Sequence, residues 1–209
     1  MLNEISLYTY IFCIIISYLL GSIPVAFIAG KFYGVNIFNI GSKQAGATNV
    51  FRELSRKAGA AVMLIDSSKG LIAIIICRLY GFSDFELILP AAFTILGHWN
   101  SPFTKFKGGD GVSTLTGLGL GIAPQQLIIP YIIIAIILFT MIYKKFSHPT
   151  IWGGSFGYLV FIFMSIWSET HLDLSVVVGF SILGLSIMIH SIYFHKKHKD
   201  NFNRKKSLD

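Results

Sequence analysis

The stretch that decides the fold class is residues 7–32, which read LYTYIFCIIISYLLGSIPVAFIAGKF. Lys31 is the only charged residue in this run. About 20 apolar residues in a helix cross the roughly 30 Å of hydrocarbon in a bilayer, so the run is long enough to span a membrane. Pro24 lies within it, and proline kinks a helix because it removes a backbone donor. We therefore predict a bent transmembrane helix, in which the bend is either a packing kink or the opening of a cavity.

Six further apolar runs follow along the chain, at residues 58–80, 85–97, 112–123, 126–143, 150–167 and 174–195. Of the 209 residues, 54% are hydrophobic and 13% are charged, whereas a soluble domain carries about 25% charged residues. We predict an all-α, polytopic integral membrane protein with about seven transmembrane helices, in a single domain over residues 1–209. The runs at 85–97 and 112–123 are short, so together they could instead form a re-entrant hairpin, which would leave five full spans.

The distribution of charge predicts the orientation. Lysine and arginine gather in alternate segments, at residues 31–57, 98–111, 144–145 and 196–209, whereas the intervening loops carry only acidic charges. Because basic loops stay in the cytoplasm, we place the N-terminus outside and the C-terminus inside, with residues 196–209 as a basic cytoplasmic tail. The net charge of +7 is then explained without a nucleic acid partner.

Two glycine-containing loops fall on the predicted cytoplasmic side. Residues 41–52 read GSKQAGATNVFR, and residues 98–114 read HWNSPFTKFKGGDGVST. Glycine lets the backbone approach a ligand closely, and the start of a helix favours an anion. The first loop also offers hydroxyl, amide and guanidinium groups suited to phosphate. The second is not a P-loop, because the Gly-Lys-Ser/Thr ending is missing. We predict that both loops bind phosphate groups.

Two charged residues, Asp66 and Lys69, lie inside the second apolar run. Three residues apart, they share one face of a helix. Charges within a membrane are costly and usually face a protein interior or a wet cavity. The pair either holds helices together or lies beside a functional site. No histidine, cysteine and carboxylate pattern suits a metal ion, so we expect no metal and no cofactor.

Taken in order, five regions resemble the PlsY family of bacterial membrane acyltransferases. They are Gly21–Pro24, Gly41–Arg52, Asp66 with Lys69 and Gly70, His98–Thr114, and the tail segment 197–204. The resemblance implies a seven-helix protein of the bacterial inner membrane whose active site faces the cytoplasm. It implies acyl transfer from acyl-phosphate to the 1-hydroxyl of glycerol 3-phosphate, which gives lysophosphatidic acid and phosphate. Its implied partners are these substrates, membrane lipid and the soluble enzyme that makes acyl-phosphate.

The resemblance also assigns roles to individual residues. The implied catalytic residues are Ser42, Arg52 and His198. The implied substrate-binding residues are Thr48, Asn49, Lys69, Lys107, Gly108, Gly109, Asp110, Gly111 and Asn201.

This sequence departs from the family pattern at the proposed phosphate site. Lys43 and Gln44 stand where the family has glycine and asparagine, and Asp110 stands where it has a lysine. The change at Asp110 reverses a charge, which Lys43 or Lys107 could offset. Two other functions therefore stay open: a weak or inactive homologue that binds a phosphorylated lipid, and a small transporter of anions.

Overall fold

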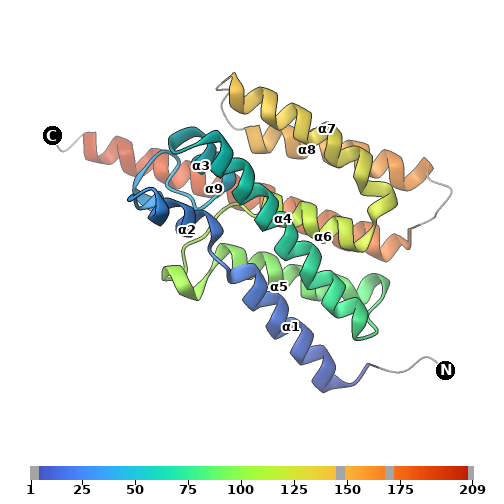
Figure 1. Cartoon of the computed structure of the whole chain (residues 1–209). Coiled ribbons are helices and arrows are strands. Elements are labelled where there is room, and N and C mark those ends of the chain that lie inside the picture. The colour runs from blue at the N-terminus through green and yellow to red at the C-terminus, as the bar shows by residue number, and fades with distance from the viewer. Residues whose placement is uncertain (1–4, 145–148, 168–171, 207–209) are drawn as a thin grey trace.

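The computed structural model describes residues 5–144, 149–167 and 172–206, and every regular element within these ranges is helical (Figure 1). The prediction of an all-α protein is confirmed. Each of the seven apolar runs forms at least one helix. The α-helices are α1 (Leu7–Ser22), α2 (Val25–Phe32), α3 (Ala47–Glu53), α4 (Arg56–Leu79), α5 (Ile88–Trp99), α6 (Val112–Ile122), α7 (Pro124–Tyr143), α8 (Pro149–Trp167) and α9 (Leu174–Lys206). Short 3-10 turns occur at η1 (Ile37–Asn39), η2 (Asp84–Leu87) and η3 (Pro102–Thr104).

Serine side chains cap two of the long helices. The Ser6 hydroxyl accepts the Thr9 N–H at 3.2 Å where α1 begins, and Ser55 caps α4 in the same way. The Glu86 carboxylate accepts the Ser83 N–H at 2.9 Å at the turn before α5. These contacts satisfy amide groups that have no partner within their helix.

The predicted bend lies between α1 and α2, at Ile23 and Pro24. The backbone carbonyls at the bend are bound by distant side chains. Ser101 donates to the Ser22 carbonyl at 2.6 Å, and the Lys69 ammonium donates to the Ile23 carbonyl at 3.1 Å. Lipid offers no hydrogen bonds, so such contacts keep a broken helix stable in a membrane. The cavity at the bend holds only about 10 Å³, close to the space that one water needs.

Glycines bring the main helix pairs together. The most extensive packing joins α1 with α5, α4 with α6, and α7 with α8. A side chain on Gly21 of α1 would overlap the Thr94 carbonyl of α5, and one on Gly97 of α5 would overlap the Tyr18 carbonyl of α1. The α4–α6 pair is built similarly at Gly117, where a side chain would overlap the Ser67 carbonyl. Small residues at such contacts are typical of membrane helices.

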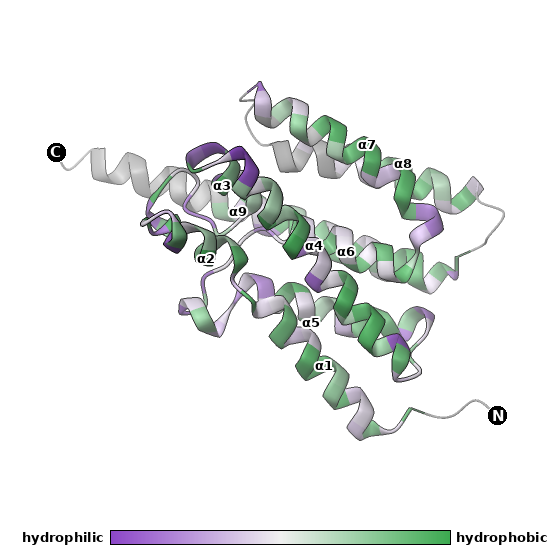
Figure 2. Cartoon of the chain, in the orientation of Figure 1, coloured by the Kyte–Doolittle hydropathy of each residue, from purple (hydrophilic) through white to green (hydrophobic). Residues whose placement is uncertain are grey.

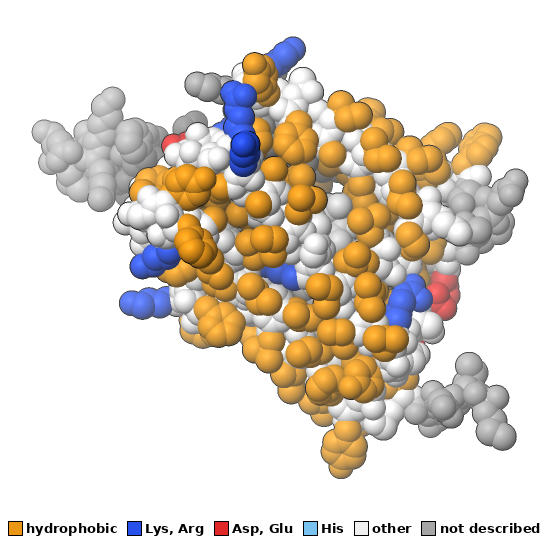
Figure 3. Space-filling model, viewed as in Figure 1, with side chains coloured by type: hydrophobic (Ala, Val, Ile, Leu, Met, Phe, Trp, Pro, Cys, Tyr) orange, Lys and Arg blue, Asp and Glu red, His pale blue; other side chains and the backbone are white. Residues whose placement is uncertain are grey.

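The outer faces of the helices are strongly apolar, as Figures 2 and 3 show. Large side chains stand exposed around the bundle, for example Ile15 (53%), Ile136 (62%) and Ile189 (59%). Water would disfavour so large an apolar surface, but lipid does not. Among the residues that the structure describes, four helical stretches are long and apolar enough to cross a membrane: Leu7–Phe32, Arg56–Leu79, Pro124–Met141 and Leu174–Phe194. Two apolar stretches are shorter: Val112–Ile122, which is α6, and Ser155–Trp167 within α8.

Candidate functional site

A buried charged cluster forms where α4, α5 and the bend after α1 meet. The Lys69 ammonium lies 2.7 Å from the Asp66 carboxylate and 2.9 Å from Nδ1 of His98. Asp66 and Lys69 are only 2% and 4% exposed. Nδ1 of His98 also lies 3.4 Å from the Thr114 hydroxyl of α6. Asp66 and Lys69 therefore neutralise each other, and they also stand directly beside the second glycine loop.

The first glycine loop is held in shape by Asn49, which lies in the first turn of α3. The Asn49 amide donates to the carbonyls of Ile37, Ile40 and Gln44 at 3.0–3.2 Å. Its side-chain oxygen accepts the Ser42 N–H at 3.1 Å. The buried Asn49 side chain is thus committed to the loop backbone. In this arrangement Asn49 shapes the site, and other groups of the loop are left to meet a ligand.

The second glycine loop packs tightly against the first. The Ala45 N–H donates to the Gly108 carbonyl at 3.1 Å. A side chain on Gly108 would overlap the His98 carbonyl, and one on Gly109 would lie 2.8 Å from Nε2 of His98. Gly111 has a φ of +93°, which favours glycine. Close packing of protein on protein thus requires the glycines that the sequence suggested for ligand approach.

Asp110 lies at the centre of this junction. One carboxylate oxygen accepts a hydrogen bond from the Gln44 amide, and the other accepts one from the Ser191 hydroxyl of α9 at 3.2 Å. The Asp110 backbone carbonyl accepts the indole N–H of Trp99 at 2.8 Å. The Trp99 ring stacks on His190 of α9, with ring centroids 4.4 Å apart. Asp110 therefore joins both loops to the last helix.

The other predicted residues are distributed around this junction. Ser42 is partly exposed, and Lys107 is exposed with its ammonium 5.9 Å from the centre of the Phe38 ring. Thr48 and Arg52 lie on α3, where Thr48 is partly buried and Arg52 is exposed. His198 and Asn201 belong to α9. The side chains of His198 and Asn201 lie outside what the structure describes.

Four residues of the junction were not among the sequence-based candidates: Gln44, His98, Trp99 and Ser191. The sequence alone drew attention to Gln44, because it departs from the family pattern beside Lys43. Nothing in the sequence drew attention to Ser191, since it is one serine within an apolar run. Its role depends on contact with a residue 81 positions away.

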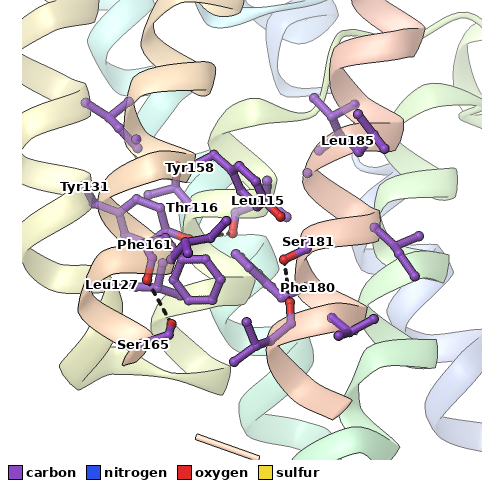
Figure 4. A pocket seen from close by; sticks show the side chains of 18 of the residues that line it. Leu115, Thr116, Leu127, Tyr131, Tyr158, Phe161, Ser165, Phe180, Ser181 and Leu185 are labelled. Carbon is purple, nitrogen blue, oxygen red and sulfur yellow. Dashed lines mark hydrogen bonds between the residues drawn. The ribbon is translucent and has the colours of Figure 1, made fainter. Parts of the chain in front are cut away.

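A large apolar pocket of about 700 Å³ opens between α6, α7, α8 and α9 (Figure 4). It begins beside the second glycine loop, because Val112 lines it and directly follows Gly111. Ile187, another lining residue, would lie 3.7 Å from a side chain on Gly111. The pocket therefore starts at the candidate phosphate site and runs between helices with apolar outer faces.

Four hydroxyl groups that line the pocket bond to the protein itself. Thr116 donates to the Val112 carbonyl at 3.0 Å, and Ser165 donates to the Phe161 carbonyl at 2.8 Å. Ser181 and Tyr131 likewise donate to backbone carbonyls. Since these four donors are already satisfied and the other lining side chains apart from Tyr158 are apolar, the pocket suits a largely apolar occupant.

Within the described part of the chain, no three histidine, cysteine, aspartate or glutamate side chains group closely enough to hold a metal ion.

Residues 11–207 match the family model described as glycerol-3-phosphate acyltransferase. A glycerol-3-phosphate acyltransferase of Streptococcus equi subsp. zooepidemicus is 34% identical over 196 residues, which cover 93% of this chain and 87% of that protein. One from Geobacter metallireducens is 42% identical over 113 residues, a match that spans 54% of this chain and 58% of that protein.

A solved structure shares the fold. The crystal structure of PlsY, an integral membrane glycerol 3-phosphate acyltransferase, in its glycerol 3-phosphate form aligns with a TM-score of 0.72 and 28% identity. The alignment covers 95% of this chain and 92% of that protein. The lysophosphatidic acid form of PlsY aligns with a TM-score of 0.68.

Proposed function

Because this chain belongs to the glycerol-3-phosphate acyltransferase family, we propose that it transfers an acyl chain from acyl-phosphate to the 1-hydroxyl of glycerol 3-phosphate. The products are lysophosphatidic acid and phosphate, so the reaction is a step of phospholipid synthesis. One observation carries the proposal: two joined glycine loops lie at the mouth of an apolar pocket. A donor with a phosphate head and a hydrocarbon tail has the chemistry of both parts.

The size and direction of the pocket support an acyl chain as its occupant. Along α9 the lining runs from Leu174 to Met188, and Ile187 lies beside the glycine loop. The 13 steps from Leu174 to Ile187 along the helix rise about 20 Å, at about 1.5 Å each. One leaflet is about 15 Å deep, half of a hydrocarbon core of roughly 30 Å. An acyl chain of ordinary length therefore fits the pocket with its phosphate at the loop.

The proposed chemistry needs positioning and charge stabilisation. The 1-hydroxyl oxygen of glycerol 3-phosphate attacks the acyl carbonyl carbon, and the carbon–oxygen bond to phosphate breaks. Phosphate leaves with the bonding electron pair, and backbone amides of the glycine loop with Arg52 and Lys107 stabilise its charge. The hydroxyl proton passes to a phosphate oxygen or to His198. Acyl-phosphate is already activated, so holding both substrates together supplies much of the catalysis.

The acceptor side of the site is assigned to the other predicted residues. Ser42 contacts the glycerol or its phosphate, and Thr48 lines the site between the loop and α3. His198 and Asn201 bind glycerol 3-phosphate from α9. Lys69 acts beside the donor, since its ammonium already contacts His98 next to the glycine loop.

We also propose that all seven apolar runs cross the membrane, with the N-terminus outside and the site on the cytoplasmic face of the inner membrane. The packing of α1 against α5 and the turn before it supports a full crossing by α5. The Tyr10 hydroxyl donates to the Glu86 carbonyl at 3.3 Å, and the Tyr18 hydroxyl donates to the Asn100 carbonyl at 2.9 Å. The segment from Glu86 to Asn100 therefore extends along α1.

The packing of α6 against α4 supports the next crossing. Arg78, near the end of α4, donates to the Gly121 and Ile122 carbonyls at 3.0 and 3.1 Å. At the other end of the pair, Gly70 of α4 packs against the Thr114 carbonyl. A cation at the last carbonyls of a helix stabilises its C-terminus, so Arg78 supports the end of α6 that lies far from the glycine loops.

The test of the proposed function is an assay of the purified protein in lipid nanodiscs. With glycerol 3-phosphate present, we expect lysophosphatidic acid and phosphate to form from hexadecanoyl phosphate, and none from hexadecanoyl-CoA. Turnover with the thioester alone would overturn the donor assignment. Failure with both donors would support the weak or inactive homologue, and uptake of glycerol 3-phosphate into proteoliposomes would support the transporter.

A further inference from the structure

Asp110 binds three separate parts of the chain at once. Its two carboxylate oxygens accept from Gln44 in the first glycine loop and Ser191 on α9, and its backbone carbonyl accepts from Trp99 at the end of α5. Gln44 is 4% exposed and Ser191 is fully buried. We call these four residues the Asp110 network. All three partners are uncharged, so the network fixes Asp110 in place without neutralising it by an ion pair.

The network holds the start of α6 in a fixed direction. Asp110 precedes Gly111, the residue at the N-cap of α6, and no side chain caps this helix. The first amides of a helix have no partner within it, and a helix N-terminus attracts anions. The first amides of α6 are therefore available to a ligand anion, and the anchored Asp110 sets where they point.

The network also fixes α9 relative to that loop. Ser191 contacts Asp110, and position 198 lies seven residues further along the same helix. Seven residues rise about 10 Å. The loop assigned to the donor and the helix assigned to the acceptor are thus joined through one carboxylate.

We propose that Asp110 is a positioning residue, which holds the donor phosphate and the acceptor hydroxyl at the separation that acyl transfer requires. This inference rests on the proposed function, and it assigns to Asp110 a role other than binding phosphate. A displacement of about 1 Å costs roughly a hundredfold in rate when two reactants must be aligned. Disrupting the network should therefore lower kcat strongly while the Michaelis constants change little.

The test exchanges the hydrogen-bond donor and the hydrogen-bond acceptor across the contact between Gln44 and Asp110. Gln44→Glu places two carboxylates against each other, and we expect kcat to fall roughly a hundredfold. Adding Asp110→Asn lets the amide nitrogen donate to the carboxylate introduced at position 44, while the amide oxygen still accepts from the Ser191 hydroxyl. The double variant should recover most of the loss. Gln125→Glu, at an exposed position at the start of α7, is the matched control and should behave like the unmodified protein.

A second measurement does not depend on acyl transfer. Hydrogen exchange of the amides at 108–113 should accelerate in Gln44→Glu and Asp110→Ala, and return towards the original rate in the double variant. If wild type turns over no donor but exchange follows this pattern, the proposed function fails while the network stands. A double variant no better than Gln44→Glu in either measurement would overturn the positioning role, as would unchanged exchange in Asp110→Ala.

Discussion

At the residue scale, burying the charged pair of Asp66 and Lys69 in the membrane interior costs free energy. Both are almost fully buried, so each charge depends on the other. Lys69→Met leaves the carboxylate unpaired, and we expect a loss of about 3–5 kcal/mol in the free energy of unfolding. The double variant Asp66→Asn with Lys69→Met should lose much less. Denaturant unfolding in detergent measures both, and equal losses would show that the charges are not coupled.

Gly184 offers a second prediction at this scale, because it lines the pocket with space around it. A side chain added there would find its nearest neighbour, Leu115, at 3.9 Å. Gly184 lies three residues along α9 from Ile187, about 5 Å from the loop end of the pocket. Gly184→Phe should therefore block the first carbons of any acyl chain, and use of both hexadecanoyl phosphate and octanoyl phosphate should fall about tenfold or more. Ile189→Phe, on the exposed face of α9, is the control and should leave both unchanged. Unchanged use of both donors in Gly184→Phe would place the acyl chain elsewhere.

At the element scale, the α4–α6 contact depends on close approach of two backbones. Gly117→Ala would push a methyl group into the Ser67 carbonyl, and overpacking of this kind costs about 1–3 kcal/mol. We expect a lower unfolding temperature for Gly117→Ala and no such decrease for Gly184→Ala. Thermal unfolding of both variants in the same detergent provides the comparison. Similar values for the two would mean that α4 and α6 can separate at no cost.

The elements themselves were largely predictable from the sequence. The apolar runs predicted the helices, since lipid requires each spanning segment to be apolar and internally hydrogen-bonded. The kink at Pro24 was predictable for a similarly local reason. What the sequence left open was its purpose, and in the structure Ser101 and Lys69 bind the carbonyls that the bend frees.

At the scale of the whole molecule, the proposed topology predicts which side of the membrane each loop faces. Cys13 and Cys77 are free but buried, so a single introduced cysteine can be followed with an impermeant maleimide. Lys105→Cys should react only from the cytoplasmic side, and Asp84→Cys only from the outside. Reaction of Asp84→Cys from the cytoplasmic side, or of Lys105→Cys from the outside, would overturn the proposed orientation.

The sequence by itself indicated the lipid environment of this protein and the kind of substrate it binds. Its apolar runs require lipid, and the family motifs and two glycine loops indicate a phosphorylated substrate. Hydropathy and glycine content are local properties, so they can be read along the chain. Only the tertiary structure decided the partners of the Asp110 carboxylate, which lie 66 and 81 residues away, and the pocket that four helices enclose. Such contacts depend on how segments far apart in the sequence pack together. The family pattern has a lysine at position 110, so from the sequence Asp110 indicated a reversed charge, and not the contact that joins the two loops to α9.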